Sequence, residues 1–461
     1  MDVVKRVEEM RDDIIKSTQE LVRIKSVEEE AEPGMPFGKG VNDSLEYALN
    51  LADEMGFETK NFDGYAGHAE IGEGDDIVGI LVHLDVVPEG SNWTYPPYAA
   101  EIHDGKLYGR GVLDDKGPAV AALYAMKALK DSGAPLNKRV RIIFGTDEES
   151  GWEGLDYYLE KEEAPTVAFA PDAEYPAIHA EMGILIFNLE QEFESGCGCE
   201  DIKIVSIKGG TAPNSVPDSC QAILEGNDLS RVEEAAKNSE FDLEAEEKDG
   251  QLIIKSTGVS AHGSLPESGQ NAISQLLVFL DSLALSSCDL CNFIKDYNEK
   301  IGMEYYGESI GCGFEDDASG KLIFNVGQID LTEDRVKVVV NIRYPVTNND
   351  KEVFESMEKA LADTNIEIVK GEQMDPLYVP ADDELVVKLM DVYRELTGDE
   401  DAEPIAIGGG TYARGVKKGV AFGPLFPGQP EIAHQKDEHM AVDDLILNAK
   451  IYAQAIAALV Q

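Results

Sequence analysis

The chain has 461 residues, of which 43% are apolar and 28% charged; this length exceeds the roughly 250–300 residues at which a single hydrophobic core usually divides, so we expect two domains. Its 89 acidic residues outnumber its 39 basic residues and give a net charge of −50. Such a chain is not expected to bind nucleic acid, which needs clusters of Lys and Arg, or to dock on an anionic membrane.

The N-terminal segment is dense in charge and has no apolar run of secretory length, so we expect no signal peptide. No stretch approaches ~18 consecutive apolar residues, which argues against a membrane span. A cytoplasmic location follows as the default. Six cysteines are expected to be reduced thiols in or near the core, with a redox or metal role left open for Cys288 and Cys291. They are Cys197, Cys199, Cys220, Cys288, Cys291 and Cys312.

Helical spacing of apolar residues predicts an amphipathic helix over the first 25 residues, and further helices over 42–56, 116–131 and from about 441. Four runs of strand length are strongly apolar: 77–82, 140–144, 166–170 and 419–423. Strands that alternate with helices indicate an α/β layer architecture with a largely parallel sheet.

From about residue 186 the pattern changes to half-buried strands with alternating apolar and polar residues. The order strand, strand, helix, strand occurs twice, with helices near 229–238 and 351–364, and suggests a loose internal repeat. We therefore expect a second domain over residues 186–384. It would be inserted into a discontinuous α/β domain formed by residues 1–185 and 385–461.

Acidic and histidine side chains stand at the ends of four strand-like runs, in LVHLD, GRGVLDDKG, RIIFGTDEESG and VAFAPDAEYP. They are His83 and Asp85, Asp114 and Asp115, Asp147 to Glu149, and Asp172 and Glu174. In open α/β sheets, ligands bind beyond the carboxyl ends of the strands, so these side chains are expected to converge there. Like charges in one crevice are unstable unless a cation neutralises them. Mixed histidine and carboxylate ligands suit zinc, and manganese or cobalt less selectively.

His83 and Asp85 lie two residues apart, so on a strand their side chains point the same way. The carboxylate can then hold the imidazole in the tautomer that leaves its other nitrogen free for a metal ion. A lone His-x-Asp or an acidic run is more often a solvated surface feature. The repeated position after an apolar strand is what favours a metal site.

Six motifs occur in the order typical of dinuclear metallo-exopeptidases: HLDVVPEG, GRGVLDDKGP, GTDEESG, PDAEYP, VSAHGSLPESGQNA and HQKDE. The chain resembles this family, which includes aminoacylases, glutamate carboxypeptidases and carnosinase-like dipeptidases, over essentially its whole length. The insert and the stretch GGGTYARGVKKGVAFGPLFPG resemble the bacterial dipeptidases of the peptidase V type. The resemblance implies a zinc-exopeptidase-like catalytic domain and an inserted α+β lid, built as a doubled ferredoxin-like half.

The resemblance also implies two divalent metal ions per chain, with Zn²⁺ expected and Mn²⁺ or Co²⁺ as alternatives. Asp114 matches the carboxylate that bridges the two ions. His83 and Asp172 would complete one ion, and Glu149 and His434 the other.

Glu148 matches the general base, which takes a proton from the water between the ions and passes it to the leaving amine. Asp85 is expected to act beside it by orienting the metal-binding histidine. His434 is preferred to His439 as a ligand because His434-x-x-x-Glu438 matches the family pattern.

The insert carries the expected substrate contacts. His262 matches the histidine that binds the carbonyl oxygen of the scissile bond. Arg343 matches the arginine that grips the substrate carboxylate, which suits a bidentate fork. Asn214 is a further expected contact. Three residues of the glycine-rich stretch offer N–H groups and a hydroxyl to the same carboxylate, unless they form a plain loop: Gly409, Gly410 and Thr411.

The expected reaction is hydrolysis of unblocked dipeptides by a hydroxide held between two metal ions. The alternative is an N-acyl-amino-acid deacylase or a carboxypeptidase of the same superfamily, although the long insert favours a dipeptidase. A non-catalytic cation-binding protein and a serine or cysteine hydrolase are disfavoured, since the sequence has no EF-hand loop and no G-x-S-x-G elbow. Because the insert is about twice as long as the family's single dimerisation module, we expect a catalytically complete monomer.

Overall fold

The computed structural model describes residues 2–133, 136–194, 202–285 and 288–461 and separates into two compact units. Unit 1 comprises Met1–Ala180, Leu377–Ala406 and Gly410–Gln461, and unit 2 comprises Glu181–Pro376 and Ile407–Gly409. Cys197 and Cys199 fall outside the described residues. Among the helices that are described, none has the length and apolar character needed to cross a bilayer.

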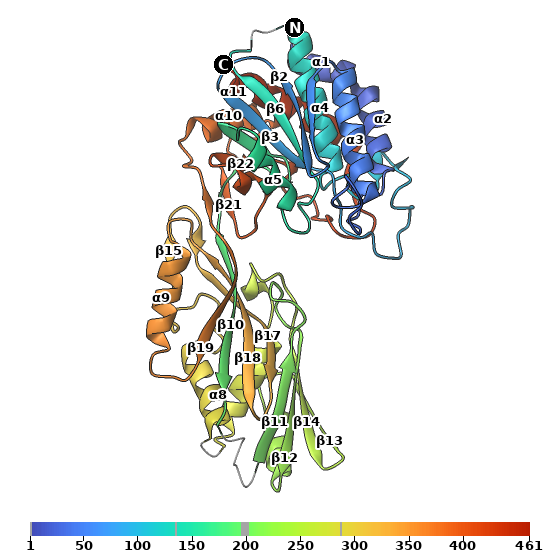
Figure 1. Cartoon of the computed structure of the whole chain (residues 1–461). Coiled ribbons are helices and arrows are strands. Elements are labelled where there is room, and N and C mark those ends of the chain that lie inside the picture. Colours follow the sequence, from blue (N-terminus) through green and yellow to red (C-terminus); the bar gives the residue numbers. More distant parts are fainter. Residues whose placement is uncertain (1, 134–135, 195–201, 286–287) are drawn as a thin grey trace. The chain divides into compact units, whose positions relative to one another are not determined.

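Unit 1 is built on a nine-stranded sheet with the order β1-β2-β6-β3-β7-β22-β9-β20, and β21 pairs with β9 (Figure 1). The strands are β1 (Glu58–Phe62), β2 (Ala66–Ile71), β3 (Ile77–His83), β6 (Arg139–Gly145), β7 (Val167–Ala170), β9 (Ile178–Glu181), β20 (Leu377–Tyr378), β21 (Ile405–Ile407) and β22 (Gly419–Ala421). The central strands β6, β3, β7 and β22 are parallel. The strands β1, β2 and β9 pair antiparallel on either side of them.

Helices cover both faces of this sheet (Figure 1). They are α1 (Val3–Glu9), α2 (Arg11–Val22), α3 (Lys39–Glu54), α4 (Lys116–Ser132), α5 (Glu153–Lys161), α10 (Glu384–Thr397), α11 (Val442–Leu459) and the short 3₁₀ helix η2 (Tyr412–Gly415). Residues of β3 alternate between the two faces: Ile80 and Val82 join the core beneath α4 and α11, whereas Leu81 packs with α5 and η2. A strand buried on both faces explains the unbroken apolar run that predicted it.

The parallel strands direct their carboxyl ends to one edge. His83, the last residue of β3, is in register with Gly145, the last residue of β6. The neighbouring strand β7 runs in the same direction and ends at Ala170. The loops that follow all three strands therefore begin at the same edge.

The remaining short strands form three small separate sheets. They are β4 (Glu101–His103), β5 (Lys106–Tyr108) and β24 (His439–Ala441), which form one small sheet; β8 (Ala173–Glu174) and β23 (Pro424–Leu425), which pair; and β15 (Glu315–Asp316) and β16 (Gly320–Lys321), which also pair.

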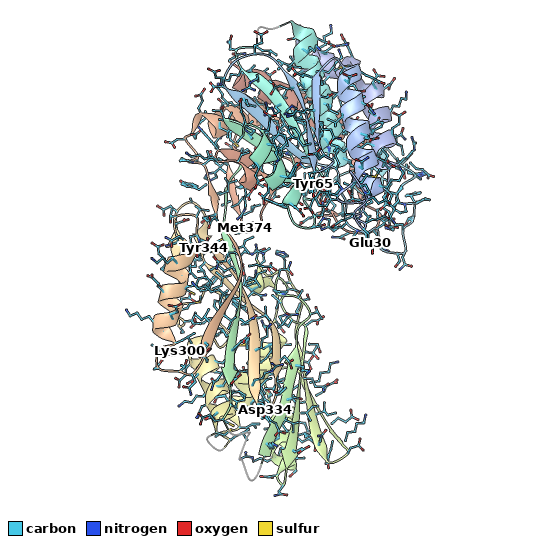
Figure 2. The ribbon with its side chains drawn as sticks, in the orientation of Figure 1. Glu30, Tyr65, Lys300, Asp334, Tyr344 and Met374 are labelled. Carbon is cyan, nitrogen blue, oxygen red and sulfur yellow. The ribbon has the colours of Figure 1, made fainter. Side chains whose placement is uncertain are left out.

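Unit 2 contains an eight-stranded antiparallel sheet with the order β13-β14-β12-β11-β17-β18-β10-β19. The strands are β10 (Gly183–Glu192), β11 (Ile202–Gly209), β12 (Ser219–Gly226), β13 (Leu243–Lys248), β14 (Gln251–Thr257), β17 (Ile323–Leu331), β18 (Arg335–Tyr344) and β19 (Glu367–Met374). Burial along β10 alternates residue by residue, as expected for a sheet with one covered face. In Figure 2, Asp334 in the β17–β18 turn lies at the opposite end of this sheet from Tyr344, the last residue of β18.

The helices in the described part of unit 2 are α6 (Leu229–Lys237), α7 (Ala272–Ser282), α8 (Asp289–Lys300) and α9 (Asp350–Ala360), together with the 3₁₀ turn η1 (Pro266–Ser268). The order β11, β12, α6, β13 recurs as β17, β18, α9, β19. In the sheet the two sets run outward from a central β11–β17 pair, so β12 corresponds to β18 and β13 to β19. The fold class is confirmed: a mixed sheet with a parallel core plus an inserted antiparallel α+β domain.

The single helix predicted for the first 25 residues is wrong. The chain leaves the helical conformation at Met10 (φ −98°, ψ 11°), between α1 and α2. Asp12 and Asp13 in the first turn of α2 favour a new helix start, because carboxylates stabilise a helix N-terminus. The helix predicted over 42–56 is α3, which begins earlier, at Lys39. Its first turn passes close to Lys25, and only a glycine fits at position 40, because a Cβ there would lie 2.0 Å from the Lys25 carbonyl oxygen.

Candidate metal centre

Five of the predicted ligands form one continuous line of contacts at the carboxyl edge of the unit 1 sheet. His83 Nε2 lies 3.5 Å from Asp172 Oδ1 and 2.8 Å from Asp114 Oδ1. The other oxygen of Asp114, Oδ2, lies 3.0 Å from His434 Nε2. His434 Nε2 also lies 2.9 Å from Glu149 Oε1. Asp114 thus stands between the two imidazoles and contacts each through a different oxygen.

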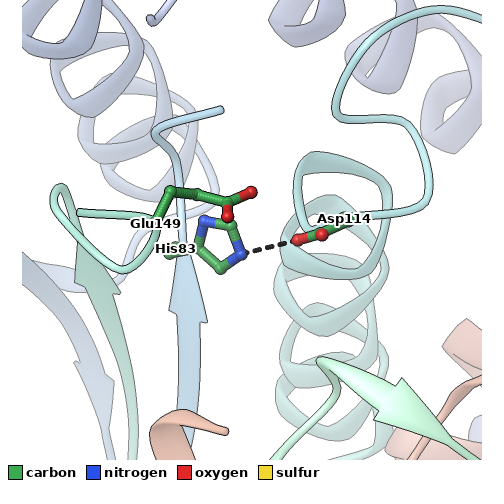
Figure 3. Close-up of side chains that lie close together, drawn as sticks. All are labelled: His83, Asp114 and Glu149. Carbon is green, nitrogen blue, oxygen red and sulfur yellow. Dashed lines mark hydrogen bonds and ion pairs between the residues drawn. The ribbon is translucent and has the colours of Figure 1, made fainter. Parts of the chain in front are cut away.

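The fold brings these side chains together from separate segments. Figure 3 shows His83 at the end of β3, Glu149 in the loop after β6, and Asp114 above the first turn of α4. Asp172 follows β7, and His434 lies far along the chain in the loop before β24. The structure places His439 elsewhere: it accepts from Lys106 Nζ and donates to the Asp437 carbonyl.

The cluster has the donors that a divalent cation needs. Ligand atoms of His83, Asp114 and Glu149 lie within 4.8 Å of one another, and so do those of His83, Glu148 and Asp172. Imidazole nitrogens with carboxylate oxygens suit zinc and similar ions. The residues therefore fit a metal centre. The second group contains Glu148, the residue that the resemblance assigns to the water instead of to a metal ion.

Charge crowding shifts the pKa values of the cluster. Burial and the charge of Asp172 raise the pKa of Glu148 well above its usual value. Burial likewise raises the pKa of Asp172 to about 7. The pKa of Asp114 is instead lowered, against its burial, because His434 and His83 donate to its two oxygens.

The neighbouring carboxylates raise the pKa values of both histidines. Hydrogen bonds to Asp114 and Glu149 raise the pKa of His434 to about 10. Burial alone would lower the pKa of His83, but Asp172, Asp114 and Asp85 raise it well above its usual value. Each imidazole is therefore protonated at neutral pH when no metal ion competes for it.

A second set of carboxylates holds the backbone that carries the ligands. Asp85 Oδ2 accepts from the Glu149 N–H at 3.0 Å. Asp115 Oδ2 accepts from the His83 N–H at 3.2 Å. Asp147 Oδ2 accepts from the N–H of Glu153 at 2.9 Å. Asp85 thus lies beside the expected base loop, where its side chain also comes within 3.4 Å of His83 Nδ1.

Sequence reasoning gave no role to three further buried residues around the loop that carries Asp114. Glu438 accepts from the backbone of this loop and from Arg110. Lys116 donates to the carbonyls of Leu21 and Ile24. The available signal was local: Arg110 and Lys116 lie close to the apolar residues Val112 and Leu113, and a charged side chain that is buried with them needs a partner.

The expected substrate residues of the insert gather within unit 2. The Gly263 N–H donates to the Asn214 carbonyl at 2.7 Å, which joins the loops of Asn214 and His262. His262 Nδ1 lies 2.6 Å from Ser264 Oγ and accepts from the Ser264 N–H, so Nε2 carries the ring proton. A Cβ on Gly408 would lie 3.0 Å from Ser264 Cβ and 3.7 Å from Arg343 Cγ.

The glycine-rich stretch is divided between the units. Gly409 belongs to unit 2, whereas Gly410 and Thr411 belong to unit 1. The Thr411 hydroxyl accepts from the Ala413 N–H at 3.2 Å and caps η2, so the structure gives this side chain a local role.

The model of peptidase family M20/M25/M40 matches residues 79–458. The chain belongs to this family. Two curated relatives match over nearly their full length. "Putative dipeptidase YtjP" of Bacillus subtilis (strain 168) is 44% identical over 97% of both chains. The Beta-Ala-Xaa dipeptidase of Lactobacillus delbrueckii subsp. lactis is 38% identical over 97% of this chain and 96% of the relative.

Solved structures show the same fold. Human carnosine dipeptidase 1 matches 100% of this chain and 99% of its own with a TM-score of 0.55 and 17% identity. The aminoacylhistidine dipeptidase of Vibrio alginolyticus matches 96% of each chain with a TM-score of 0.58 and 14% identity. The predicted membership of the metallo-exopeptidase family is confirmed.

Metal binding should release protons and tighten as the pH rises. His434, with a pKa of about 10, must lose its proton before Nε2 can hold an ion. Affinity for Zn²⁺ should therefore increase from pH 6 towards roughly pH 9. Calorimetric titration in buffers of different ionisation enthalpy measures the protons released. His434→Gln should release fewer protons and bind more weakly, whereas His103→Gln should behave as wild type. A proton count of zero would contradict this electrostatic account.

Proposed function

We propose that the chain is a metal-dependent dipeptidase that hydrolyses the peptide bond of unblocked dipeptides. The observation that carries this proposal is the position of Asp114 between two imidazoles, with Asp172 and Glu149 at the two ends. The family and the full-length dipeptidase relatives support the same reaction. The chain is thus a hydrolase of the M20 metallopeptidase family.

Two divalent ions fit the donor set, one with His83 and Asp172 and the other with Glu149 and His434, with Asp114 shared. Zn²⁺ is the ion we propose, because imidazole and carboxylate together suit it, and Mn²⁺ or Co²⁺ can occupy similar sites. Such ions, when bound, lower the pKa of water and polarise the scissile carbonyl. The backbone carbonyl of Asp85 accepts from His83 Nδ1 at 3.0 Å and so keeps the imidazole oriented, with the Asp85 carboxylate 3.4 Å from the same nitrogen.

Glu148 is the proposed general base. Burial and the charge of Asp172 raise the pKa of Glu148, which makes its carboxylate a stronger acceptor for the proton that it takes from water and later gives to the leaving amine. The next residue, Glu149, points its carboxylate to His434. Adjacent residues thus serve different tasks because they leave the same loop in different directions.

Unit 2 is the proposed lid, and residues 186–384 are the proposed inserted domain. His262 offers its protonated Nε2 to the carbonyl oxygen of the scissile bond. Arg343 binds the substrate carboxylate, together with the backbone of Gly409 and Gly410 and the hydroxyl of Thr411, and Asn214 is a further substrate contact. The support is the proximity of Asn214, His262 and Arg343 within unit 2 and the tautomer that Ser264 imposes on His262. A cytoplasmic location stays a prediction.

The symmetry of unit 2 supports a monomer that is complete on its own. Its central β11–β17 pair joins two similar halves within one chain. The edge strand β13 carries Glu244, Glu246 and Glu247. Charged edge strands resist pairing with another chain.

A panel of substrates tests the proposed reaction. Ala-Ala and β-alanyl-histidine should be hydrolysed, whereas N-acetyl-alanine and a C-terminally extended peptide should not. Chelation should abolish turnover, and Zn²⁺, Mn²⁺ or Co²⁺ should restore it. Faster hydrolysis of the N-acetyl amino acid would support the deacylase, and release of C-terminal residues from longer peptides would support the carboxypeptidase.

Neighbouring substitutions should separate the base from the ligand. Glu148→Gln should retain the metal ions and lower turnover at least about 100-fold, as expected for loss of a general base. Glu149→Gln should instead weaken metal binding. The matched control is Glu153→Gln, which alters an exposed side chain at the start of α5. Metal analysis and kcat are the measurements; near-wild-type kcat in Glu148→Gln contradicts the assignment.

Mixing inactive chains tests the self-contained monomer. Glu148→Gln and His262→Ala chains should stay inactive when they are combined, because each chain lacks a group that only its own fold supplies. The assay is dipeptide hydrolysis after co-refolding. If activity returns in the mixture, residues of one chain complete the site of another, and the monomer proposal is wrong.

A further inference from the structure

Glu438 is fully buried, and its carboxylate accepts four hydrogen bonds from the segment that leads to Asp114. Oε2 accepts from Arg110 Nη1 at 2.6 Å and from the Gly111 N–H at 3.0 Å. Oε1 accepts from the Leu113 N–H at 2.9 Å and from the Asp114 N–H at 3.4 Å. Both oxygens are therefore used, and three of the donors are backbone groups that only an acceptor can satisfy.

The same segment is fixed at its start. The Gly109 N–H donates to the Glu438 carbonyl at 3.0 Å, and the Arg110 N–H donates to Pro97 at 2.8 Å. Gly111 has φ +86°, and a Cβ there would lie 2.7 Å from Val86 Cγ1. The backbone conformation of segment 109–114 is therefore closely constrained, and the Glu438 carboxylate accepts the hydrogen bonds that constrain it.

Glu438 also ends the segment that carries His434. Its neighbour Asp437 is held from the other side, because Asp437 accepts from the Thr94 N–H at 2.6 Å and from Thr94 Oγ1 at 3.0 Å. One buried carboxylate therefore joins the two segments whose side chains, Asp114 and His434, meet at 3.0 Å.

We propose that Glu438 is a positioning residue of the metal centre, and the proposal rests on the proposed function. Glu438 touches neither ligand atom of the cluster. It sets the path of segment 109–114 and thereby fixes the Asp114 carboxylate relative to the imidazole of His434. Because a bridging carboxylate must meet two ions at once, an error in this path lowers the affinity of both sites.

Glu438→Gln tests this role with a side chain of the same shape. The amide NH₂ that replaces one carboxylate oxygen is itself a donor and faces N–H donors, so the hydrogen bonds that this oxygen accepted are lost. Zn²⁺ affinity should fall about 10–100-fold, as for other groups that support metal ligands. Excess Zn²⁺ should restore much of kcat, and KM for Ala-Ala should change little.

The matched control is Glu70→Gln. Glu70 accepts from the buried Arg141 Nε at 2.6 Å, between β2 and β6, so the variant loses a comparable ion pair away from the segments 109–114 and 434–438. Its Zn²⁺ affinity should equal that of wild type. Wild-type Zn²⁺ affinity in Glu438→Gln, or an equal loss in both variants, would overturn the positioning role.

Hydrogen exchange on the wild-type chain provides a test that needs no variant. If Glu438 holds the segment, the amides of Gly111 and Leu113 should be protected without metal and gain little when Zn²⁺ is added. Fast exchange without metal and protection only with Zn²⁺ would show that the ions order the segment, and would overturn the inference. A wild-type chain that binds no Zn²⁺ would instead overturn the proposed function. In that case, fast exchange of the Gly111 and Leu113 amides would also show that Glu438 does not hold the segment.

Discussion

Mutual repulsion of carboxylates is the constraint on which the centre of unit 1 depends. Parallel strands β3, β6 and β7 end at one edge, and each is followed by acidic side chains. Asp114 and Asp172 both contact His83, and their negative charges raise the pKa of the buried Glu148. Like charges that are buried together are stable only beside cations. Imidazolium groups supply the positive charge in this chain, and the divalent ions that we propose would replace their protons.

The remaining acids are stabilised by the backbone. Asp85, Asp115 and Asp147 each accept one backbone N–H at this edge, and Glu438 accepts three together with the Arg110 guanidinium. A carboxylate that accepts several N–H bonds is stable and also fixes the backbone that donates them. The same groups that add charge to the centre thus determine its geometry.

Much of this arrangement could be predicted from the sequence. The strands that end at His83 and Gly145 are buried along nearly their whole length, so their apolar runs predict them clearly, and the acidic residues that follow such strands meet at one edge of the sheet. The resemblance supplied His434, because no periodic pattern connects that loop with the strands. Glu438 and Arg110 were missed as partners, because the local sequence around Arg110 does not indicate which acidic residue, here one 328 positions away, pairs with it. The break at Met10 was missed because α1 and α2 continue the same apolar face, and β13 was missed because an edge strand rich in Glu resembles a solvated loop.

The most direct test of the account is the position of the metal ions themselves. Crystals of the chain grown with Zn²⁺, measured at the zinc absorption edge, should show two anomalous peaks roughly 3.5–4 Å apart. One peak should contact His83 and Asp172, the other Glu149 and His434, and both should contact the carboxylate of Asp114. A single peak at full occupancy, or two peaks that do not share Asp114, would contradict the account.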